Sequence, residues 1–223
     1  MPRSKANYDR ESDNIIPPFA YIVATEGETE QDYFNKFINN YPNKLIELVF
    51  VPKEGKSKNE SSPKQVFGYL SAFDKEYNIR KDQNKKLWQL ADRDRWRKHI
   101  VDAYKNCIKN KYNFILSNPC FELWLFLHYK SINELSEKER VDIYENKKGK
   151  NKKGSKKRNY LDKELVNICG SYNKSNINFE HYKDKIQTAI NNAKKIKDYS
   201  IPYPNDRLGT DVFILVEELL SMK

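Results

Sequence analysis

The sequence contains few of the residues that build disulfide frameworks and zinc sites. Its 223 residues include only 3 cysteines and 3 histidines. Cys107, Cys120 and Cys169 lie far apart, and no CxxC pair occurs. Disulfide frameworks need an even set of cysteines, and zinc sites need closely spaced ligands. We therefore expect neither in this protein.

The sequence also lacks a hydrophobic run long enough to cross a membrane. The longest strongly apolar run, Phe121–Tyr129, is much shorter than the roughly 20 residues that a membrane-spanning helix needs. The N-terminal segment MPRSKANYDRES has no apolar core of the kind found in signal peptides. We expect a soluble, cytoplasmic protein that has no membrane partner.

Acidic residues are outnumbered by basic ones. The chain has 41 Lys and Arg residues against 31 Asp and Glu residues, which gives a net charge of +10. Such an excess favours an anionic partner, most simply nucleic acid. The candidate nucleic-acid contacts are Arg93, Arg95, Lys152, Lys153, Lys156, Lys157, Arg158 and Arg207. The lysine-rich run at 147–159 has no apolar anchor, and both a phosphate-binding role and a solubilising role stay open for it.

Apolar strand-like segments alternate with helical patterns in the first half of the chain. The expected strands span 19–25, 45–51, 87–91 and 112–116. This alternation predicts an α/β fold with a parallel sheet of about four strands flanked by helices. After Ser131 the patterns are helical.

These patterns divide the chain into three expected parts. Residues 1–18 are polar, which predicts a flexible N-terminal arm. Residues 19–130 form the expected α/β catalytic core. Residues 131–223 form a helical elaboration packed on that core, with the basic loop at 147–159.

Four acidic residues follow the predicted strands at their carboxyl ends. Glu26 follows the first strand, Asp92 and Asp94 follow the third, and Glu122 follows the fourth. Open parallel sheets bind ligands at this edge, and the Asp-x-Asp spacing directs both carboxylates to one side of an extended chain. Converging carboxylates repel unless a cation holds them. Oxygen ligands without His or Cys favour Mg²⁺ or Mn²⁺, so we predict a metal site at these four residues.

Glu122 is the most unusual of the four, because it lies in the apolar stretch SNPCFELWLFLHY at 117–129. If Asn118 caps a helix that starts at Pro119, a capping-box glutamate would fall at position 121, which is Phe. A carboxylate on an apolar face needs a partner, and the predicted partner is the metal ion. Ordinary alternatives exist for each acidic position: an exposed turn, a solvated strand end, or a favourable charge at a helix N-terminus.

His128 lies in the same stretch and could act in acid–base chemistry. It shares a helical face with Phe121, Trp124 and Leu125. We expect a satisfied core histidine instead.

Four segments carry a resemblance to a known family. TEGETEQDYF, LADRDRW, SNPCFELWLFLHY and GTDVFILVEELL resemble the RloB-like family, and the resemblance spans residues 19–220. Glu-Gly after one strand and Asp-x-Asp after a later one also resemble the Toprim domain of topoisomerases, primases and overcoming-lysogenization-defect nucleases. The usual first Toprim motif is Glu-Gly-x-x-Asp, and Glu30 stands here at the position of that Asp.

The resemblance implies a Toprim-like core and a Mg²⁺-dependent endonuclease that acts in antiviral defence or abortive infection. It implies that Glu26 is a metal ligand or general base, that Asp92 and Asp94 are metal ligands, and that Glu122 is a further acidic ligand. By analogy with other Toprim defence effectors, RNA, tRNA included, is slightly favoured over DNA as the substrate.

The resemblance also bears on partners and on rival functions. Relatives are often encoded beside an ATPase, so gating by a partner ATPase or by homo-oligomerisation is expected. One alternative is a non-catalytic nucleic-acid-binding adaptor that keeps the carboxylates for a structural metal. A nucleotidyl transferase of the primase kind would need a nucleoside-triphosphate pocket, and the sequence has no evident one.

Overall fold

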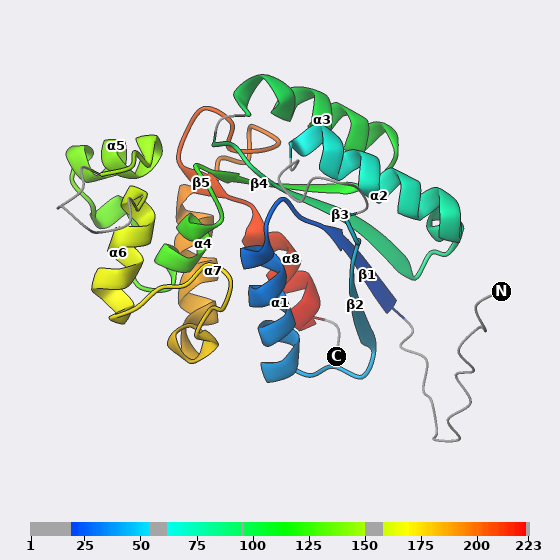
Figure 1. Cartoon of the computed structure of the whole chain (residues 1–223), viewed down its shortest axis with the longest axis horizontal. Coiled ribbons are helices and arrows are strands. Elements are labelled where there is room, and N and C mark those ends of the chain that lie inside the picture. The colour runs from blue at the N-terminus through cyan, green and yellow to red at the C-terminus, as the bar shows by residue number, and fades with distance from the viewer. Residues whose placement is uncertain (1–18, 54–61, 95, 150–157, 222–223) are drawn as a thin grey trace, which may run out of the picture.

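The computed structural model describes residues 19–53, 62–94, 96–149 and 158–221 (Figure 1). The predicted arm at 1–18 and residues 150–157 of the basic run lie outside this part of the chain.

A five-stranded sheet in the order β2-β1-β3-β4-β5 forms the centre of the fold. The strands are β1 (Phe19–Ala24), β2 (Ile46–Phe50), β3 (Lys85–Asp92), β4 (Asn113–Asn118) and β5 (Gly209–Thr210). The first four are parallel to their neighbours, whereas β5 pairs antiparallel with β4. The predicted α/β class is confirmed, but the sheet is mixed and has one strand more than predicted. A strand of two residues is too short to show any alternation of apolar and polar residues, so the sequence pattern did not reveal β5.

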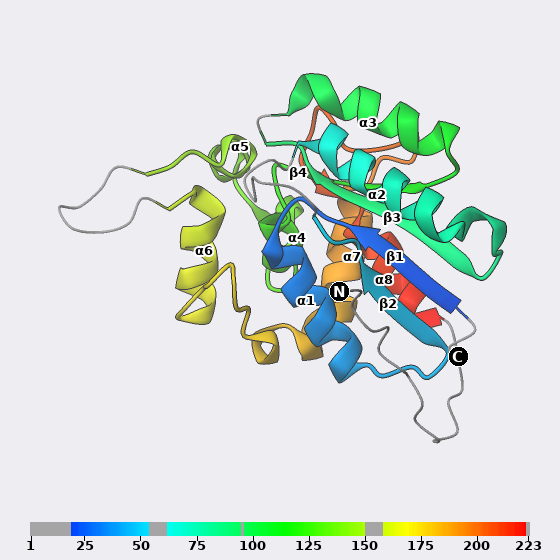
Figure 2. The same ribbon diagram turned by 45° about the vertical axis from the view of Figure 1, so that its right-hand side comes forward.

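Helices cover both faces of this sheet (Figure 1). The α-helices are α1 (Glu28–Asn40), α2 (Pro63–Tyr77), α3 (Arg97–Lys109), α4 (Glu122–Leu127), α5 (Glu137–Glu145), α6 (Tyr160–Cys169), α7 (Ile186–Ile196) and α8 (Val212–Ser221). Short 3₁₀ turns span Ile79–Lys81, Ile132–Glu134, Phe179–His181 and Lys183–Lys185. Helices α2 and α3 lie on one face, and α1, α7 and α8 lie on the other. Helices α5 and α6 lie beyond the carboxyl ends of the parallel strands, at the left in Figures 1 and 2.

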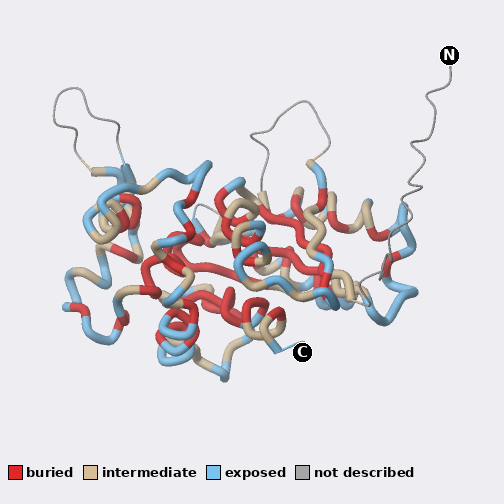
Figure 3. Tube along the Cα trace, turned by 90° about the horizontal axis from the view of Figure 1, so that it is seen from below, coloured by how far each residue is buried: buried red, intermediate tan, exposed pale blue. Residues whose placement is uncertain are grey.

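The alternation of side chains along the strands divides the core between the two faces. In β1, Tyr21 and Val23 enter the larger core, whereas Ile22 and Ala24 enter a second one with residues of α2. A strand buried on both faces is typical of a parallel sheet covered by helices. Figure 3 shows the buried positions concentrated in the strands and on the inner sides of the helices. The larger core also contains Leu165 of α6, so the two halves of the chain share it.

Two helix starts show which local predictions were correct. Helix α2 begins at Pro63, a residue that suits the first position of a helix, and Ser62 and Gln65 form a reciprocal capping box. The predicted cap at Asn118 is wrong. Asn118 is the last residue of β4, and its side-chain amide donates to the carbonyls of the 204–207 loop at 2.6–2.9 Å. Helix α4 begins at Glu122, three residues after Pro119.

No helix in the described ranges is long and apolar enough to cross a membrane.

Candidate active site

Five carboxylates line one cavity of about 240 Å³ at the carboxyl edge of the sheet. They belong to Glu26, Glu30, Asp92, Asp94 and Glu122. The four predicted site residues are thus brought together, because β1, β3 and β4 are neighbours and end side by side. Glu30, which the resemblance places in the first Toprim motif, is the fifth member.

The Asp-x-Asp pair follows the end of β3 into this cavity. Asp92 is the last residue of the strand, and the amide of Asp94 donates to the Pro119 carbonyl at 2.9 Å. Asp94 itself is exposed and has a φ of +21°, where the chain turns away from the extended conformation. This hydrogen bond holds the chain after β3 beside the segment that follows β4. Both carboxylates line the cavity.

Gly27 lets Glu30 turn back toward Glu26. A Cβ atom on Gly27 would lie 2.8 Å from Oε2 of Glu30, which is closer than real Cβ contacts. Gly27 is also the N-cap of α1, so the Glu-Gly motif joins the strand end to a helix whose first turn adds a second carboxylate. Glu30 is only 4% exposed.

These carboxylates destabilise one another's charge. Burial, together with the charge of Glu30, raises the pKa of Glu26 well above its usual value. Burial raises the pKa of Glu30 to about 7, and the charge of Glu122 adds to that increase. Burial raises the pKa of Asp92 as well, with contributions from Glu30 and Glu26. The cavity therefore carries negative charge that a bound cation would stabilise.

Glu122 has a partner that the sequence did not indicate. Nζ of Lys174 lies 2.6 Å from Oε1 of Glu122, and the hydroxyl of Tyr172 donates to the same oxygen at 2.9 Å. Burial alone would raise the pKa of Glu122, but the charge and hydrogen bond of Lys174 hold it below its usual value. The partner that the structure provides for this carboxylate is an ammonium group, where sequence analysis expected a metal ion.

Lys174 also pairs with Asp162 of α6, at 3.1 Å. Burial opposes the charge of Lys174, but the carboxylates of Glu122 and Asp162 raise its pKa above the usual value. Tyr172 and Lys174 lie in the loop between α6 and the 3₁₀ turn at Phe179–His181. The second half of the chain thus contributes directly to the site.

The donor set fits a hard cation, although it is not arranged as a finished coordination shell. Within the part of the chain that the structure describes, no group of three or more His, Cys, Asp or Glu side chains could hold a metal ion as placed. Lys174 engages Glu122 in an ion pair. Oε1 of Glu26 accepts a hydrogen bond from the Asp92 amide at 3.3 Å. The carboxylate oxygens that line the cavity have the chemistry of Mg²⁺ or Mn²⁺ ligands, and the metal site stays a prediction.

The predicted nucleic-acid contacts lie in different environments. Arg93 is 2% exposed, its Nε donates to Asn118 at 2.8 Å, and its guanidinium lies over the ring of Tyr144. That position does not suit a phosphate contact, so we assign Arg93 a structural role. Arg207 is exposed and pairs with Asp198, and Arg158 is exposed as well. The remaining candidates, Arg95, Lys152, Lys153, Lys156 and Lys157, lie outside the described residues.

His128 is a core histidine, as predicted. It is buried, its Nδ1 lies 2.9 Å from the Trp124 carbonyl, and its Nε2 lies 3.3 Å from the Tyr33 hydroxyl.

Sequence reasoning missed four members of this region, Lys53, Asp162, Tyr172 and Lys174. Lys53 lies three residues after the end of β2, so the same strand-end rule that found Glu26 could have found it. The other three come from α6 and its following loop, and no local pattern reveals where these dock.

The fold and the cavity define an α/β protein with an acidic site at the carboxyl edge of its sheet. The family comparison is more specific. The model of the RloB-like protein family matches residues 21–219, and the chain belongs to that family. Among curated proteins and among solved structures, none matches the chain at a significant level.

Proposed function

We propose that this protein is a metal-dependent nuclease with a Toprim-like core, which cleaves phosphodiester bonds of nucleic acid in antiviral defence. The observation that carries the proposal is the convergence of Glu26, Glu30, Asp92 and Asp94 on one cavity beside two lysines, Lys53 and Lys174. The defence role and the slight preference for RNA follow from the family resemblance.

The residues of the cavity have distinct roles in this proposal. Asp92, Asp94 and Glu122 would hold Mg²⁺ or Mn²⁺, which supplies charge stabilisation to the attacking and leaving oxygens when bound. Glu26 would accept the proton of the attacking water, the role that the family resemblance implies for it. The positive charge of the chain favours binding of the polyanionic substrate.

A specific observation also favours the second candidate, a non-catalytic nucleic-acid-binding adaptor. Lys174 already neutralises Glu122, so one expected metal ligand is engaged by the protein itself. In an adaptor the acidic cluster would keep a structural role, and the basic surface would still bind nucleic acid.

The two candidates separate in a cleavage assay. The full chain is incubated with total RNA, plasmid DNA and single-stranded DNA in Mg²⁺, Mn²⁺ or EDTA, with and without any ATPase that a neighbouring gene encodes. Asp92→Asn and Glu26→Gln should each lower cleavage by at least about 100-fold, the scale of general acid–base catalysis. Asp102→Asn, an exposed carboxylate on α3, is the matched control and should cut as the wild type does.

Each result decides between the candidates. Cleavage that stops in EDTA and in the two site variants supports the nuclease. Binding without cleavage in every condition supports the adaptor and rejects the nuclease. Full cleavage by Asp92→Asn would show that the acidic cavity is not the active site.

A further inference from the structure

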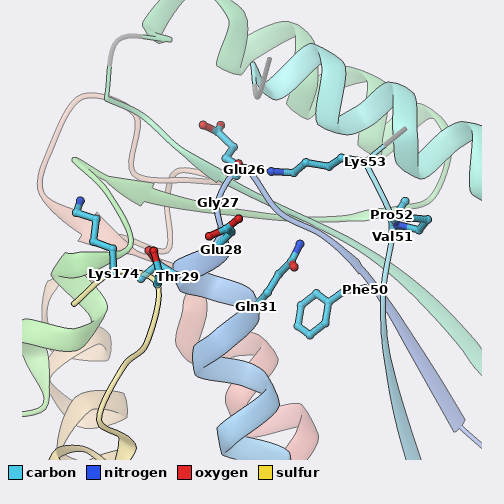
Figure 4. Close-up of a pocket in the computed structure, with 11 residues that line it drawn as sticks. Glu26, Gly27, Glu28, Thr29, Gln31, Phe50, Val51, Pro52, Lys53 and Lys174 are labelled. Carbon is cyan, nitrogen blue, oxygen red and sulfur yellow. Dashed lines mark hydrogen bonds between the residues drawn. The ribbon is translucent and has the colours of Figure 1, made fainter. Parts of the chain in front are cut away.

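A second, larger cleft opens beside the acidic cavity (Figure 4). Its volume is about 630 Å³, and it shares Glu26, Gly27, Thr29 and Lys174 with the acidic cavity. Pockets of about 300–1,000 Å³ are the usual size for small organic ligands. The cleft is therefore large enough for a nucleoside placed next to the acidic site.

Two lysines flank the shared part of the clefts. Lys53 reaches toward Glu26 from the segment after β2, while Lys174 lies on the opposite side (Figure 4). Nζ of Lys53 donates to the main-chain carbonyl of Glu26 at 2.5 Å. An ammonium group has three N–H donors, so this contact leaves Lys53 capacity for a phosphate oxygen. A phosphate beside Glu26 would lie between the two positive charges.

The wall of the larger cleft carries an aromatic ring and an uncharged amide. Phe50, the last residue of β2, presents its ring beside the side chain of Gln31 from α1 (Figure 4). The Gln31 amide donates to the Thr25 hydroxyl at 3.2 Å, which holds the amide at the cleft. An aromatic face next to an amide is a combination with which proteins stack and hydrogen-bond an unpaired base.

We propose that the larger cleft binds one unpaired nucleotide next to the reacting phosphate, with its base against Phe50 and its phosphate held by Lys53. This inference rests on the proposed function, because it takes nucleic acid as the substrate. A base inside a duplex is stacked on both sides and must be unstacked before it can enter such a cleft. The proposal therefore assigns single-stranded or locally unpaired nucleic acid as the substrate class.

Binding in the absence of cleavage tests the proposal. Short fluorescent single strands of RNA and of DNA, and the matching duplexes, are titrated with the full chain in EDTA, and anisotropy reports affinity. Single strands should bind at least about tenfold more tightly than duplexes. Phe50→Ala should weaken single-strand binding about 5-fold or more, as expected for one lost stacking contact, whereas Phe50→Trp should retain it.

The contact between Lys53 and the phosphate is tested by the salt dependence of binding. Lys53→Gln should weaken binding and reduce the slope of log K against log salt by about one, the amount expected for one phosphate contact. The matched control is Lys44→Gln, because Lys44 lies two residues before β2, at the opposite end of that strand from the cleft. Phe73→Ala on α2, where Phe73 stacks with Tyr77, is the control for loss of an aromatic ring.

The outcomes separate this inference from the proposed function. Equal affinity for single strands and duplexes, or unchanged binding by a folded Phe50→Ala variant, would overturn the inference even if the protein cleaves nucleic acid. Stacking-dependent binding by a protein that never cleaves would support the cleft and reject the nuclease. Phe50 also packs against the larger core. Urea denaturation of each variant therefore checks that a loss of binding does not result from unfolding.

Discussion

Glu122 is a buried carboxylate whose charge is balanced by a lysine from a distant part of the chain. Only 5% of the Glu122 side chain is exposed, whereas Lys174 keeps 45% of its side chain exposed. An ion pair between a buried acid and a half-exposed base places a positive charge permanently at the edge of the acidic cavity. Lys174 and a bound cation therefore compete for the same negative charge.

Replacing Lys174 with Met should expose this competition. In metal-free buffer, Lys174→Met should lower the free energy of unfolding by about 1–2 kcal/mol, less than the 3–5 kcal/mol typical of a fully buried pair, because solvent screens the exposed lysine. The variant should bind Mg²⁺ at least about tenfold more tightly, since a repelling charge within a few ångströms is removed. Isothermal titration and thermal unfolding with and without Mg²⁺ measure both effects.

The matched control is Lys194→Met, which breaks the Lys194–Glu217 ion pair between α7 and α8 at 2.6 Å. It should leave Mg²⁺ affinity unchanged. Equal Mg²⁺ affinity of Lys174→Met and the wild type would contradict the competition.

The contrast between Glu26 and Lys174 shows how far sequence reasoning reaches at this scale. Glu26, Asp92 and Asp94 could be predicted because they follow apolar strands directly, and parallel strands end at a common edge. Lys174 follows no strand and lies in a loop without periodicity, in the segment SYNKSN. Its role depends on how α6 docks, which is a property of tertiary packing.

At the scale of elements, α4 is a six-residue helix, Glu122–Leu127, in which every residue is buried. Helices this short are not stable alone, so α4 depends on the contacts around it. His128, at its C-terminal end, provides one of them. Its Nδ1–H donates to the Trp124 carbonyl and its Nε2 accepts from the Tyr33 hydroxyl of α1, which requires the neutral imidazole.

This neutral imidazole predicts a pH dependence of stability. Burial lowers the pKa of His128 to about 3, whereas the unfolded chain protonates near about 6.5. Only the unfolded state gains a proton as the pH falls below about 6.5, so the stability contributed by His128 is complete above that pH and is lost as the pH falls toward 3. Between pH 7.5 and 5.5 the loss should be about 1.4 kcal/mol.

Urea denaturation of the wild type and of His128→Gln at the two pH values measures this difference. The variant should lack about 1.4 kcal/mol of the pH-dependent loss, while Tyr33→Phe, which keeps the imidazole, should show it in full. A wild type and a His128→Gln variant with the same pH dependence would refute the assignment.

Element-scale prediction succeeded where a segment is long enough to show a period. The four parallel strands were predicted within a few residues because each is a run of apolar residues. Strand β5 has two residues, Gly209–Thr210, and Asn118, the expected helix cap, bonds instead to the 204–207 loop. Both features come from contacts with distant residues, and local sequence patterns do not encode them.

At the scale of the whole molecule, the two halves of the chain form one structure around the same sheet. Strand β5 from the second half pairs with β4, and the larger core joins Tyr33, Trp124, Leu165 and Leu215. We therefore expect residues 19–130 and 131–223 to unfold together. Fluorescence of the tryptophans in β3 and α4 and far-ultraviolet circular dichroism should give coincident urea transitions.

Leu165→Ala in α6 leaves a cavity in the shared core and should shift both transitions together, by about 2–5 kcal/mol. Val141→Ala, which truncates an exposed side chain of α5, should shift neither appreciably. Two separate transitions, with only one moved by Leu165→Ala, would instead mean that the helical elaboration is an independent unit. The acidic cavity would then lie between two units, and Lys174 would be able to leave it without unfolding the sheet.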